Sequence, residues 1–256
     1  MTPRADQTLK QLSRDGILAF WAGELGVNVP ELQRPNIGVS ITTNTTSSGI
    51  TIFRRDNDVR ISASHTKIER MRDEFPFAKS EDFCRPEFWR TAFPDISGTM
   101  NGPAHYYYVD AVPKTWTPPP TSRSLLLVRG LAASDLKLCA ELAHALTREE
   151  RELSGFDTIG RHAWGVFARG KLVAIAGYDA WPNRMAHIGI ATHPEHRGNK
   201  FGQLAAQAAI RGAVSRRRIA QYRCLAENTA AVGIAKALGL TCFAEALFIH
   251  PRDGRD

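Results

Sequence analysis

Paired cysteines and long apolar runs are both missing from this sequence of 256 residues. Its four cysteines, Cys84, Cys139, Cys224 and Cys242, include no C-x-x-C pair, so they do not make a disulfide framework. A run of about 18 apolar residues, as a membrane-spanning helix needs, does not occur. The polar N-terminus, 1–10, has no apolar stretch of the signal-peptide type. We therefore expect a reduced, cytoplasmic protein that is not inserted in a membrane.

Two common phosphate-binding motifs and a common zinc motif are also missing. No G-x-x-x-x-G-K-[ST] string occurs, and Lys200 occupies the place where a G-x-G-x-x-G loop needs its middle glycine. His193 and His196 flank Glu195, but their spacing is not that of a helical H-E-x-x-H zinc site. We expect no metal.

Positive charge is concentrated in the second half of the chain. Residues 1–120 hold 14 Lys+Arg and 14 Asp+Glu, whereas residues 121–256 hold 19 and 12. An excess of this kind favours an anionic partner, either a phosphorylated cofactor or nucleic acid, although a basic solvated surface has the same composition. The run Arg216–Arg218 follows a predicted helix, and no aromatic residues are interleaved with it, which argues against nucleic acid.

The chain divides most clearly at 115–122, where three consecutive prolines favour an extended conformation. We predict an N-terminal α+β domain over 1–118, a linker over 119–122 and a second domain over 123–256. In the first domain the pattern predicts helices over 7–25, 66–75 and 80–91, and strands over 36–41, 50–53, 59–62 and 105–109. The last strand holds Tyr106, Tyr107 and Tyr108, which serve either packing or an acceptor site, since three neighbours cannot share one face.

The second domain has a clearer pattern. Strands are predicted over 125–128, 163–168, 172–180, 185–192, 221–226 and 243–250, and helices over 134–147, 202–215 and 228–238. This order predicts an α/β (α+β) fold, with a mixed, largely antiparallel sheet flanked by helices.

The segment 188–204 carries the most chemical information. A strand ends, a turn contains Pro194, and a loop with Gly198 opens the helix at Gly202. Amide groups at a helix N-terminus lack intrahelical acceptors, and the helix dipole adds positive charge there. With Arg197 and Lys200 nearby, the segment predicts a site for an anion such as a pyrophosphate.

This segment resembles the signature of the GNAT superfamily of N-acetyltransferases, V-x-P-x-x-R-G-x-G-x-G/A, through Pro194, Arg197, Gly198 and Gly202. It departs from the signature at Thr192 and Lys200, which are usually an aliphatic residue and a glycine. A second family motif, N-x-x-A-x-x-L-Y-x-x-x-G-F, is matched by Asn228, Ala231 and Gly239. Strings at 154–157, 173–178, 186–189 and 221–223 resemble a bacterial subgroup that carries an extra N-terminal domain.

The resemblance implies an enzyme that uses acetyl-CoA, or another acyl-CoA, as co-substrate. The family strand equivalent to 185–192 usually has a bulge and splays from the next strand, 221–226, and the pantetheine arm lies between them. The residues that the resemblance assigns to the cofactor are Ile190, Ala191, Thr192, Arg197, Gly198, Asn199, Lys200, Phe201, Gly202, Gln203 and Asn228. Asn228 also fits a plain helix N-cap.

Direct attack of an amine on the thioester, which the resemblance implies, needs a base and a proton for the leaving thiolate. The family's usual tyrosine acid is replaced by Ala235, so Tyr222 or Tyr178 is a candidate, as is an unprotonated thiolate. The base candidates are His187 on the cofactor strand and Glu152 with its neighbouring glutamates. Each also fits a structural role.

Three functions are compatible with these features. The first is acetylation of a primary amine on a small molecule. The second is acetylation of a protein or tRNA amine, for which the positive charge argues. The third is a non-catalytic acyl-CoA sensor, for which Ala235 argues. A homodimer is compatible with the resemblance.

Overall fold

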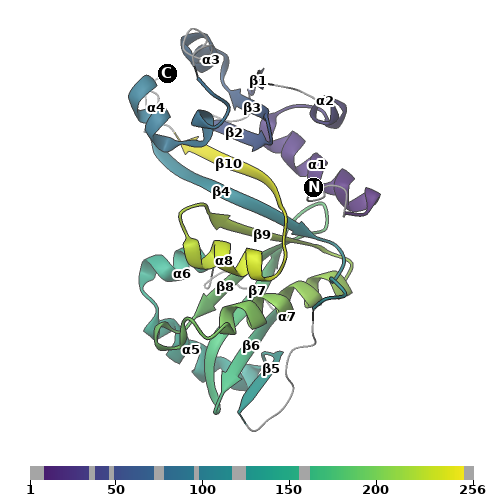
Figure 1. Ribbon diagram of the computed structural model, residues 1–256, viewed down its shortest axis with the longest axis vertical. Coiled ribbons are helices and arrows are strands. Elements are labelled where there is room, and N and C mark those ends of the chain that lie inside the picture. The colour runs from purple at the N-terminus through teal and green to yellow at the C-terminus, as the bar shows by residue number, and fades with distance from the viewer. Residues whose placement is uncertain are drawn as a thin grey trace. The chain divides into compact units, whose positions relative to one another are not determined.

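The computed structural model describes residues 9–34, 38–45, 49–71, 78–94, 98–116, 125–155 and 162–250 (Figure 1). It divides into two compact units. Unit 1 holds Met1–Tyr107, Arg223–Val232 and Cys242–Asp256, and unit 2 holds Tyr108–Tyr222 and Gly233–Thr241. The predicted linker prolines lie outside the described residues, and the division into domains at 119–122 stays a prediction.

Unit 1 is built on a sheet in the order β1-β3-β2-β10-β4. Strands β1 and β3 are parallel, and the other neighbours are antiparallel. Its strands are β1 (Gly38–Thr43), β2 (Ile50–Arg55), β3 (Asp58–Ala63), β4 (Thr99–Val109) and β10 (Cys242–His250). Its helices are α1 (Gln11–Leu25), α2 (Val29–Gln33), α3 (His65–Met71) and α4 (Pro86–Ala92). The last two residues of β4, Tyr108 and Val109, belong to unit 2.

Strand alternation gives this sheet two packed faces. Ile52 and Ile61 lie in one hydrophobic cluster with Trp89 of α4. Phe53, the next residue on β2, contacts Trp21 of α1 with ring centroids 4.6 Å apart. Tyr106 also packs against Trp21, at 4.8 Å, so this tyrosine has the packing role that was one of the two alternatives.

Unit 2 is built on a sheet in the order β9-β8-β7-β6-β5. Strands β5 to β8 are antiparallel neighbours, and β8 and β9 are parallel. Its strands are β5 (Leu126–Gly130), β6 (His162–Ala168), β7 (Lys171–Ala180), β8 (Met185–Thr192) and β9 (Ile219–Leu225). Its helices are α5 (Leu136–Ala145), α6 (Arg148–Ser154), α7 (Phe201–Ser215) and α8 (Thr229–Ala237). The unit boundaries fall within β9, after Tyr222, and within α8, after Val232.

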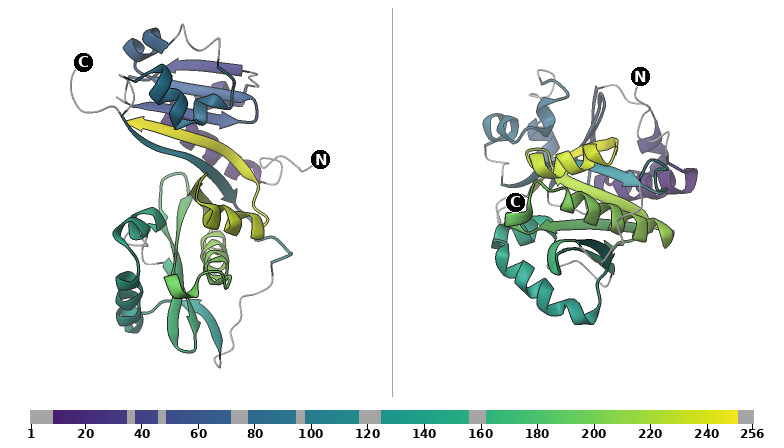
Figure 2. Two further views of the ribbon diagram at one scale, coloured as in Figure 1. Left: turned by 60° about the vertical axis from the view of Figure 1, so that its left-hand side comes forward. Right: turned by 60° about the horizontal axis from the view of Figure 1, so that its bottom comes forward.

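Helices cover both faces of the unit 2 sheet, with α5 and α6 on one face and α7 on the other (Figure 2). Leu142 of α5 shares a hydrophobic cluster with Ile175 of β7 and Ala191 of β8. The sheet side of α7 consists mainly of small residues, which allows a close approach. A Cβ at Gly212 would lie 2.0 Å from the Trp164 ring. The predicted fold class, a mixed, largely antiparallel sheet flanked by helices, is confirmed.

Helix α6 was not predicted, because its sequence looks like a charged, solvated segment. Thr147 accepts a hydrogen bond from the backbone of Glu150, whose carboxylate accepts one from the backbone of Thr147. This T-x-x-E capping box is visible in the sequence and was the signal that could have found the helix.

Asp135 stands at the N-cap of α5 without a side-chain capping bond to it, and closes a short 3₁₀ turn before the helix. Its carboxylate accepts two hydrogen bonds from the Arg129 guanidinium, at 2.6 and 2.8 Å, and one from the amide of Ala132. The Arg129 guanidinium lowers the pKa of Asp135 from its ordinary 3.8 to about 2. The carboxylate therefore ties the end of β5 to the start of α5.

We expect Asp135→Asn to lower the free energy of unfolding by about 2 kcal/mol, because a buried charged pair loses one partner. A lowered pKa stabilises the fold above the ordinary value of 3.8, and this contribution disappears as the pH falls toward about 2. Urea denaturation at several pH values checks both points. The wild-type protein should lose stability between pH 4 and 2 as Asp135 is protonated, and the variant should lack this loss. A variant with the same acid dependence as the wild type contradicts the role of this pair.

Candidate functional site

Strand β8 has neighbours on both sides within unit 2. It pairs with β9 from Met185↔Ile219 to Ile188↔Tyr222, and Tyr222 is the last residue of β9 in this unit. On the other side, β8 pairs with β7 without a register shift from Ala180↔Ala186 to Ala174↔Thr192. The bulge that the family resemblance implied is therefore not seen in the pairing of β8 with β7.

Hydrogen bonds at the two ends of β8 show which of its backbone groups point away from β7. The amide of His193 donates to Val173, and the amide of Trp181 donates to Met185. Because bonded pairs alternate in an antiparallel ladder, the odd-numbered residues of β8 bond to β7. The backbone groups of Ile190 and Thr192 consequently point away from β7, whereas those of Ala191 face it.

The N-terminus of α7 meets the end of β8. Lys200, the N-cap residue of this 15-residue helix, makes no side-chain capping bond among the described residues. The first amide of the helix that has a backbone acceptor is that of Leu204, which donates to the carbonyl of Lys200. The amides of Phe201, Gly202 and Gln203 are therefore available to an anion, and the helix dipole favours one there.

Gly202 is required by close packing rather than by backbone conformation. A Cβ at this position would lie 2.8 Å from Oγ1 of Thr192 and 3.2 Å from Cδ1 of Ile234. Ile190 is the third neighbour, at 3.8 Å. Any larger residue must displace these side chains, so glycine keeps the first turn of α7 against β8.

Lys200 adopts the left-handed conformation, with φ 63° and ψ 11°. This explains why the family signature usually has glycine here, since the left-handed region costs other residues roughly 1–2 kcal/mol. Gly198, with φ 79°, takes a positive φ without this cost. The lysine is thus kept in an unfavourable conformation at the entrance of an anion site.

We expect Lys200→Gly to raise the free energy of unfolding by about 0.5–1 kcal/mol while weakening acyl-CoA binding by up to about tenfold. The glycine relieves the left-handed strain, and the loss of the ammonium removes one phosphate contact. Lys200→Ala is the matched control, because it removes the charge and keeps the strain. Urea unfolding and titration of acetyl-CoA should show equal affinity losses in the two variants but a gain in stability in the glycine variant alone.

The rest of the loop is braced by polar contacts. Asn199 donates from its amide to the carbonyls of His196 and Arg197, at 3.2 Å each. Arg197 donates to Glu150 of α6 at 2.7 Å, and its side chain is half exposed. Hydrogen bonds from the Thr147 amide and from Arg197 lower the pKa of Glu150. Arg197 is therefore held by a carboxylate with which a phosphate would have to compete.

His187 lies in a polar cluster on β8, beside the last residues that pair with β9. Its Nδ1 is 3.1 Å from Oε1 of Gln221, and Nε2 of Gln221 donates to the Tyr108 hydroxyl at 3.1 Å. The ring of Trp181 stacks on His187, with centroids 4.8 Å apart and planes 17° apart. Sequence reasoning did not select Gln221 or Trp181, because only strand register brings them to His187.

Glu152 does not join this cluster. Its carboxylate accepts a hydrogen bond from Arg148, at 2.8 Å, in an exposed pair within α6. This is the arrangement of a solvated helix face, so His187 is the better-supported base candidate.

The acid candidates lie on the other face of the sheet from His187. Tyr222 is buried and pairs with Ile188, which alternates with His187 along β8. The Tyr178 ring stacks on Trp164 at 6.2 Å, and its buried hydroxyl has no hydrogen-bond partner among the described residues.

Ala235, which stands where the family usually has its tyrosine acid, is fully buried. Asn228 accepts from the amide of Ala231 at 3.0 Å, which is its N-cap role, and its role toward pantetheine stays a prediction.

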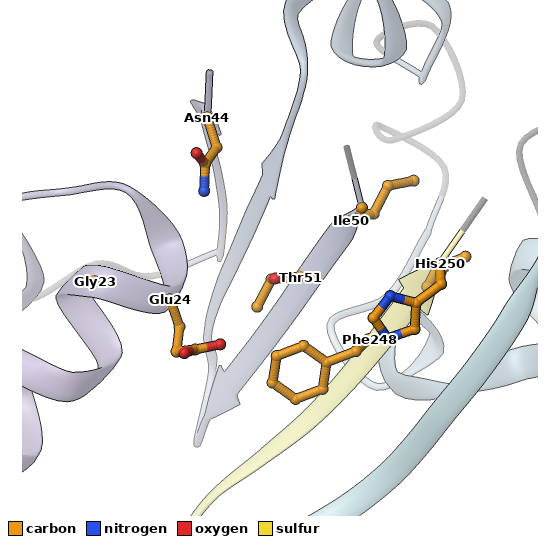
Figure 3. A pocket seen from close by; sticks show the side chains of 9 residues that line it. Gly23, Glu24, Asn44, Ile50, Thr51, Phe248 and His250 are labelled. Carbon is orange, nitrogen blue, oxygen red and sulfur yellow. The ribbon is translucent and has the colours of Figure 1, made fainter. Parts of the chain in front are cut away.

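Each unit also has a hollow among its described residues. In unit 1, a pocket of about 230 Å³ is bordered by Glu24 of α1, Thr51 of β2, and Phe248 and His250 of β10 (Figure 3). Burial raises the pKa of Glu24. In unit 2, a hollow of about 450 Å³ is lined by Arg129, Trp164, Arg211 and Arg216. Its arginines bond to the protein itself, to Asp135, to the Trp116 carbonyl and to the Gly212 carbonyl.

Neither a metal-ligating cluster nor a membrane-spanning helix is found in the described part of the chain. No three His, Cys, Asp or Glu side chains gather there in a way that could hold a metal ion. None of the helices described there is both long and apolar enough to cross a membrane.

Comparison with known proteins gives one family and several similar structures. Residues 139–245 match the family model described as GNAT acetyltransferase. None of the curated proteins matches the sequence. A GNAT-family acetyltransferase structure from Novosphingobium aromaticivorans is 23% identical, with TM-score 0.45, over 61% of this chain and 67% of that chain. One from Colwellia psychrerythraea is 13% identical, with TM-score 0.46, over 64% and 61%.

A Salmonella typhimurium acetyl transferase that modifies the N-terminal serine of ribosomal protein L7/L12 is also similar. It is 16% identical, with TM-score 0.37, over 53% of this chain and 99% of that chain. At such TM-scores the structures carry no argument about the reaction.

Proposed function

We propose that this chain, whose residues 139–245 match the GNAT acetyltransferase family model, is an N-acetyltransferase that transfers an acetyl group from acetyl-CoA to a primary amine of a small molecule. The observation that carries this proposal is the meeting of two features in unit 2. One is the N-terminus of α7, whose N-cap residue makes no side-chain capping bond among the described residues, and the other is the end of β8, where the backbone groups of Ile190 and Thr192 point away from β7. Together they offer amides to phosphates and backbone groups to an amide-containing arm.

The proposed cofactor residues have distinct tasks. The amides of Phe201, Gly202 and Gln203 bind the pyrophosphate, and Lys200 adds charge. The backbone groups of Ile190 and Thr192 bind the pantetheine arm, since the ladder alternation directs them away from β7. Gly198 and Asn199 shape the loop, while Arg197 contributes only if the phosphate displaces Glu150.

In the proposed mechanism, His187 takes a proton from the acceptor ammonium and becomes imidazolium. The neutral amine attacks the thioester carbonyl carbon, an N–C bond forms, and the C–S bond breaks to release CoA as a thiolate. The nitrogen loses its second proton to solvent water, and the thiolate takes up one proton, so the protons balance. Water is the proposed donor of that proton, because a thiol with an ordinary pKa near 8.5 is a good leaving group. Tyr222 is the alternative donor, although its side chain lies on the opposite face of the sheet from His187.

A small acceptor is favoured over a nucleic acid by the contacts of the basic run at the end of α7. Arg216 donates to the Gly212 carbonyl, and Arg218 donates to the Met185 carbonyl. These two arginines therefore bind the end of α7 and the strand β8. A protein amine stays an alternative acceptor, and the buried Ala235 keeps a non-catalytic acyl-CoA sensor as the other alternative.

The test is release of CoA thiol from acetyl-CoA in the presence of a panel of small amines, lysine peptides and aminoacyl-tRNA. We expect turnover with small amines that is nearly independent of salt. Turnover that occurs only with tRNA and falls steeply with salt would instead support a macromolecular acceptor. Binding of acetyl-CoA without turnover on any amine would support the sensor.

A further inference from the structure

The fold of unit 1 leaves a hollow between the end of α1 and the sheet. Ile50 and Ile52 of β2 belong to the hydrophobic cluster on the α4 side of the sheet, so Thr51 between them faces the α1 side. Thr51 pairs directly with Phe248 of β10, whose ring therefore lies on the same face. The last turn of α1 borders the same hollow through Glu24. Strand register and helix length thus bring a carboxylate, a hydroxyl and an aromatic ring to one space (Figure 3).

Described side chains do not fill this hollow. Gly23 borders it, and a Cβ placed on this glycine would meet no described atom within 4 Å. The volume of about 230 Å³ corresponds to about eight water molecules at about 30 Å³ each. This is room for a short alkyl chain with a polar head, and not for acyl-CoA.

The polar groups of the hollow are without partners among the described residues. The carboxylate of Glu24 makes neither a hydrogen bond nor an ion pair there, and burial raises its pKa. Thr51 has an exposed fraction of 7%, and its hydroxyl makes no hydrogen bond to a described residue. A partly buried anion without a counter-ion and a buried hydroxyl without a partner are both unfavourable. A ligand with a cationic donor satisfies both groups.

The walls of the hollow select the charge of the ligand. Among its described lining residues there is no lysine or arginine, and Glu24 is the one carboxylate. An anion is therefore repelled, and a divalent metal ion, which needs several oxygen ligands, finds a single carboxylate. The half-buried ring of Phe248 attracts a cation that lies over its face. His250, two residues further along β10, is exposed.

We propose that this hollow is a binding site for a small organic ammonium ion, with Glu24 as its counter-ion, Thr51 as a hydrogen-bond acceptor and Phe248 as its aromatic wall. The ammonium group lies between the carboxylate and the hydroxyl, and the alkyl part packs on the ring. The site goes beyond the proposed acetyl transfer, because its residues all belong to unit 1 and binding requires no acetyl-CoA.

The first test uses butylammonium as the probe and 1-butanol as its neutral counterpart. Shifts of the backbone amide signals of the ¹⁵N-labelled chain follow each titration, without acetyl-CoA. We expect saturable binding of butylammonium and none of the alcohol over the same concentrations. Glu24→Gln should weaken binding at least about tenfold, because a charge-assisted hydrogen bond is lost. Glu87→Gln is the matched control, since it removes the same charge from an exposed pair with Arg90 on α4, and it should keep the wild-type affinity.

The second test separates the hydroxyl from the rest of the site. Thr51→Val removes the hydroxyl and keeps the branched shape that suits a strand. It should weaken butylammonium binding by about three- to tenfold. Binding of tetramethylammonium should be unchanged, since this ion has no N–H to donate and is held by the carboxylate and the ring. Equal losses with both probes overturn the role of Thr51.

Three results overturn the ammonium site itself. They are the absence of butylammonium binding to the wild type, equal binding of 1-butanol, and equal affinities of Glu24→Gln and Glu87→Gln. Addition of acetyl-CoA then identifies the kind of ligand that the site takes. Formation of N-butylacetamide at a rate that Glu24→Gln lowers identifies an acceptor, and binding without product identifies an ammonium ion that is not acetylated. Because the titrations need no acetyl-CoA, failure of the proposed acetyl transfer leaves their result unchanged.

Discussion

Gly202→Asp is expected to abolish acetyl-CoA binding while leaving the protein folded. The aspartate brings a carboxylate to the amides of the first turn of α7, where it competes with phosphate and repels it. The same carboxylate is favourable at a helix N-terminus, by about 0.3–1 kcal/mol, which offsets part of the packing cost. A Cβ here lies 2.8 Å from the Thr192 side chain, so some displacement is unavoidable.

The measurement is the rise in Tm that acetyl-CoA produces. A ligand at 100 times its Kd stabilises the folded state by about 2.7 kcal/mol, and the aspartate variant should show no such rise. Gly202→Ala is the matched control, since it adds the same Cβ without the charge. We expect it to keep a reduced rise. Equal losses in both variants would mean that packing, not charge, governs the site, and a full rise in the aspartate variant would place the phosphates elsewhere.

The second large effect is expected from His187→Gln. Removal of the general base should lower kcat by about 100-fold or more, since such groups contribute about 10²–10⁴. Acetyl-CoA affinity should stay close to that of the wild type, because the His187 side chain lies on the face of β8 opposite to those of Ile190 and Thr192.

His162→Gln serves as the control for this variant. His162 stacks on Tyr178 in β6, with ring centroids 5.0 Å apart, and no part of the mechanism uses it. Its substitution should leave kcat within about twofold, in line with the small effect of substitutions away from special features. A wild-type rate in His187→Gln would exclude this histidine as the base and return the question to Glu152 or to an unassisted amine.

The loop before α7 and the order of helices and strands along the second half of the chain could be predicted because their signals are local. Pro194, Gly198 and Gly202 mark a turn, a loop and a helix start within a few residues, and the structure has α7 starting at Phe201. The boundaries of β8 agree with the prediction at both ends, because an apolar strand between two turns has sharp limits. The left-handed conformation of Lys200 explains why the family pattern has glycine there, but not why this chain has lysine.

The polar cluster around His187 could not be predicted in the same way. Gln221 lies 34 residues from His187 and 113 residues from Tyr108 along the chain. Only the register of β8 with β9 and the fold of the chain bring these three residues together. Glu152 was a candidate because it follows the first helix, but the undetected capping box at Thr147 places it on an exposed helix face. Strand register and side-chain exposure are set by tertiary packing, which a sequence pattern does not contain.

The measurement that tests the central claim most directly is a calorimetric titration of acetyl-CoA into the wild-type protein. The account predicts saturable heat for one site per chain, which CoA added beforehand suppresses by competition. Absence of binding would contradict it, since it would mean that Lys200 and Thr192 have eliminated the acyl-CoA site and that the fold no longer serves acyl transfer.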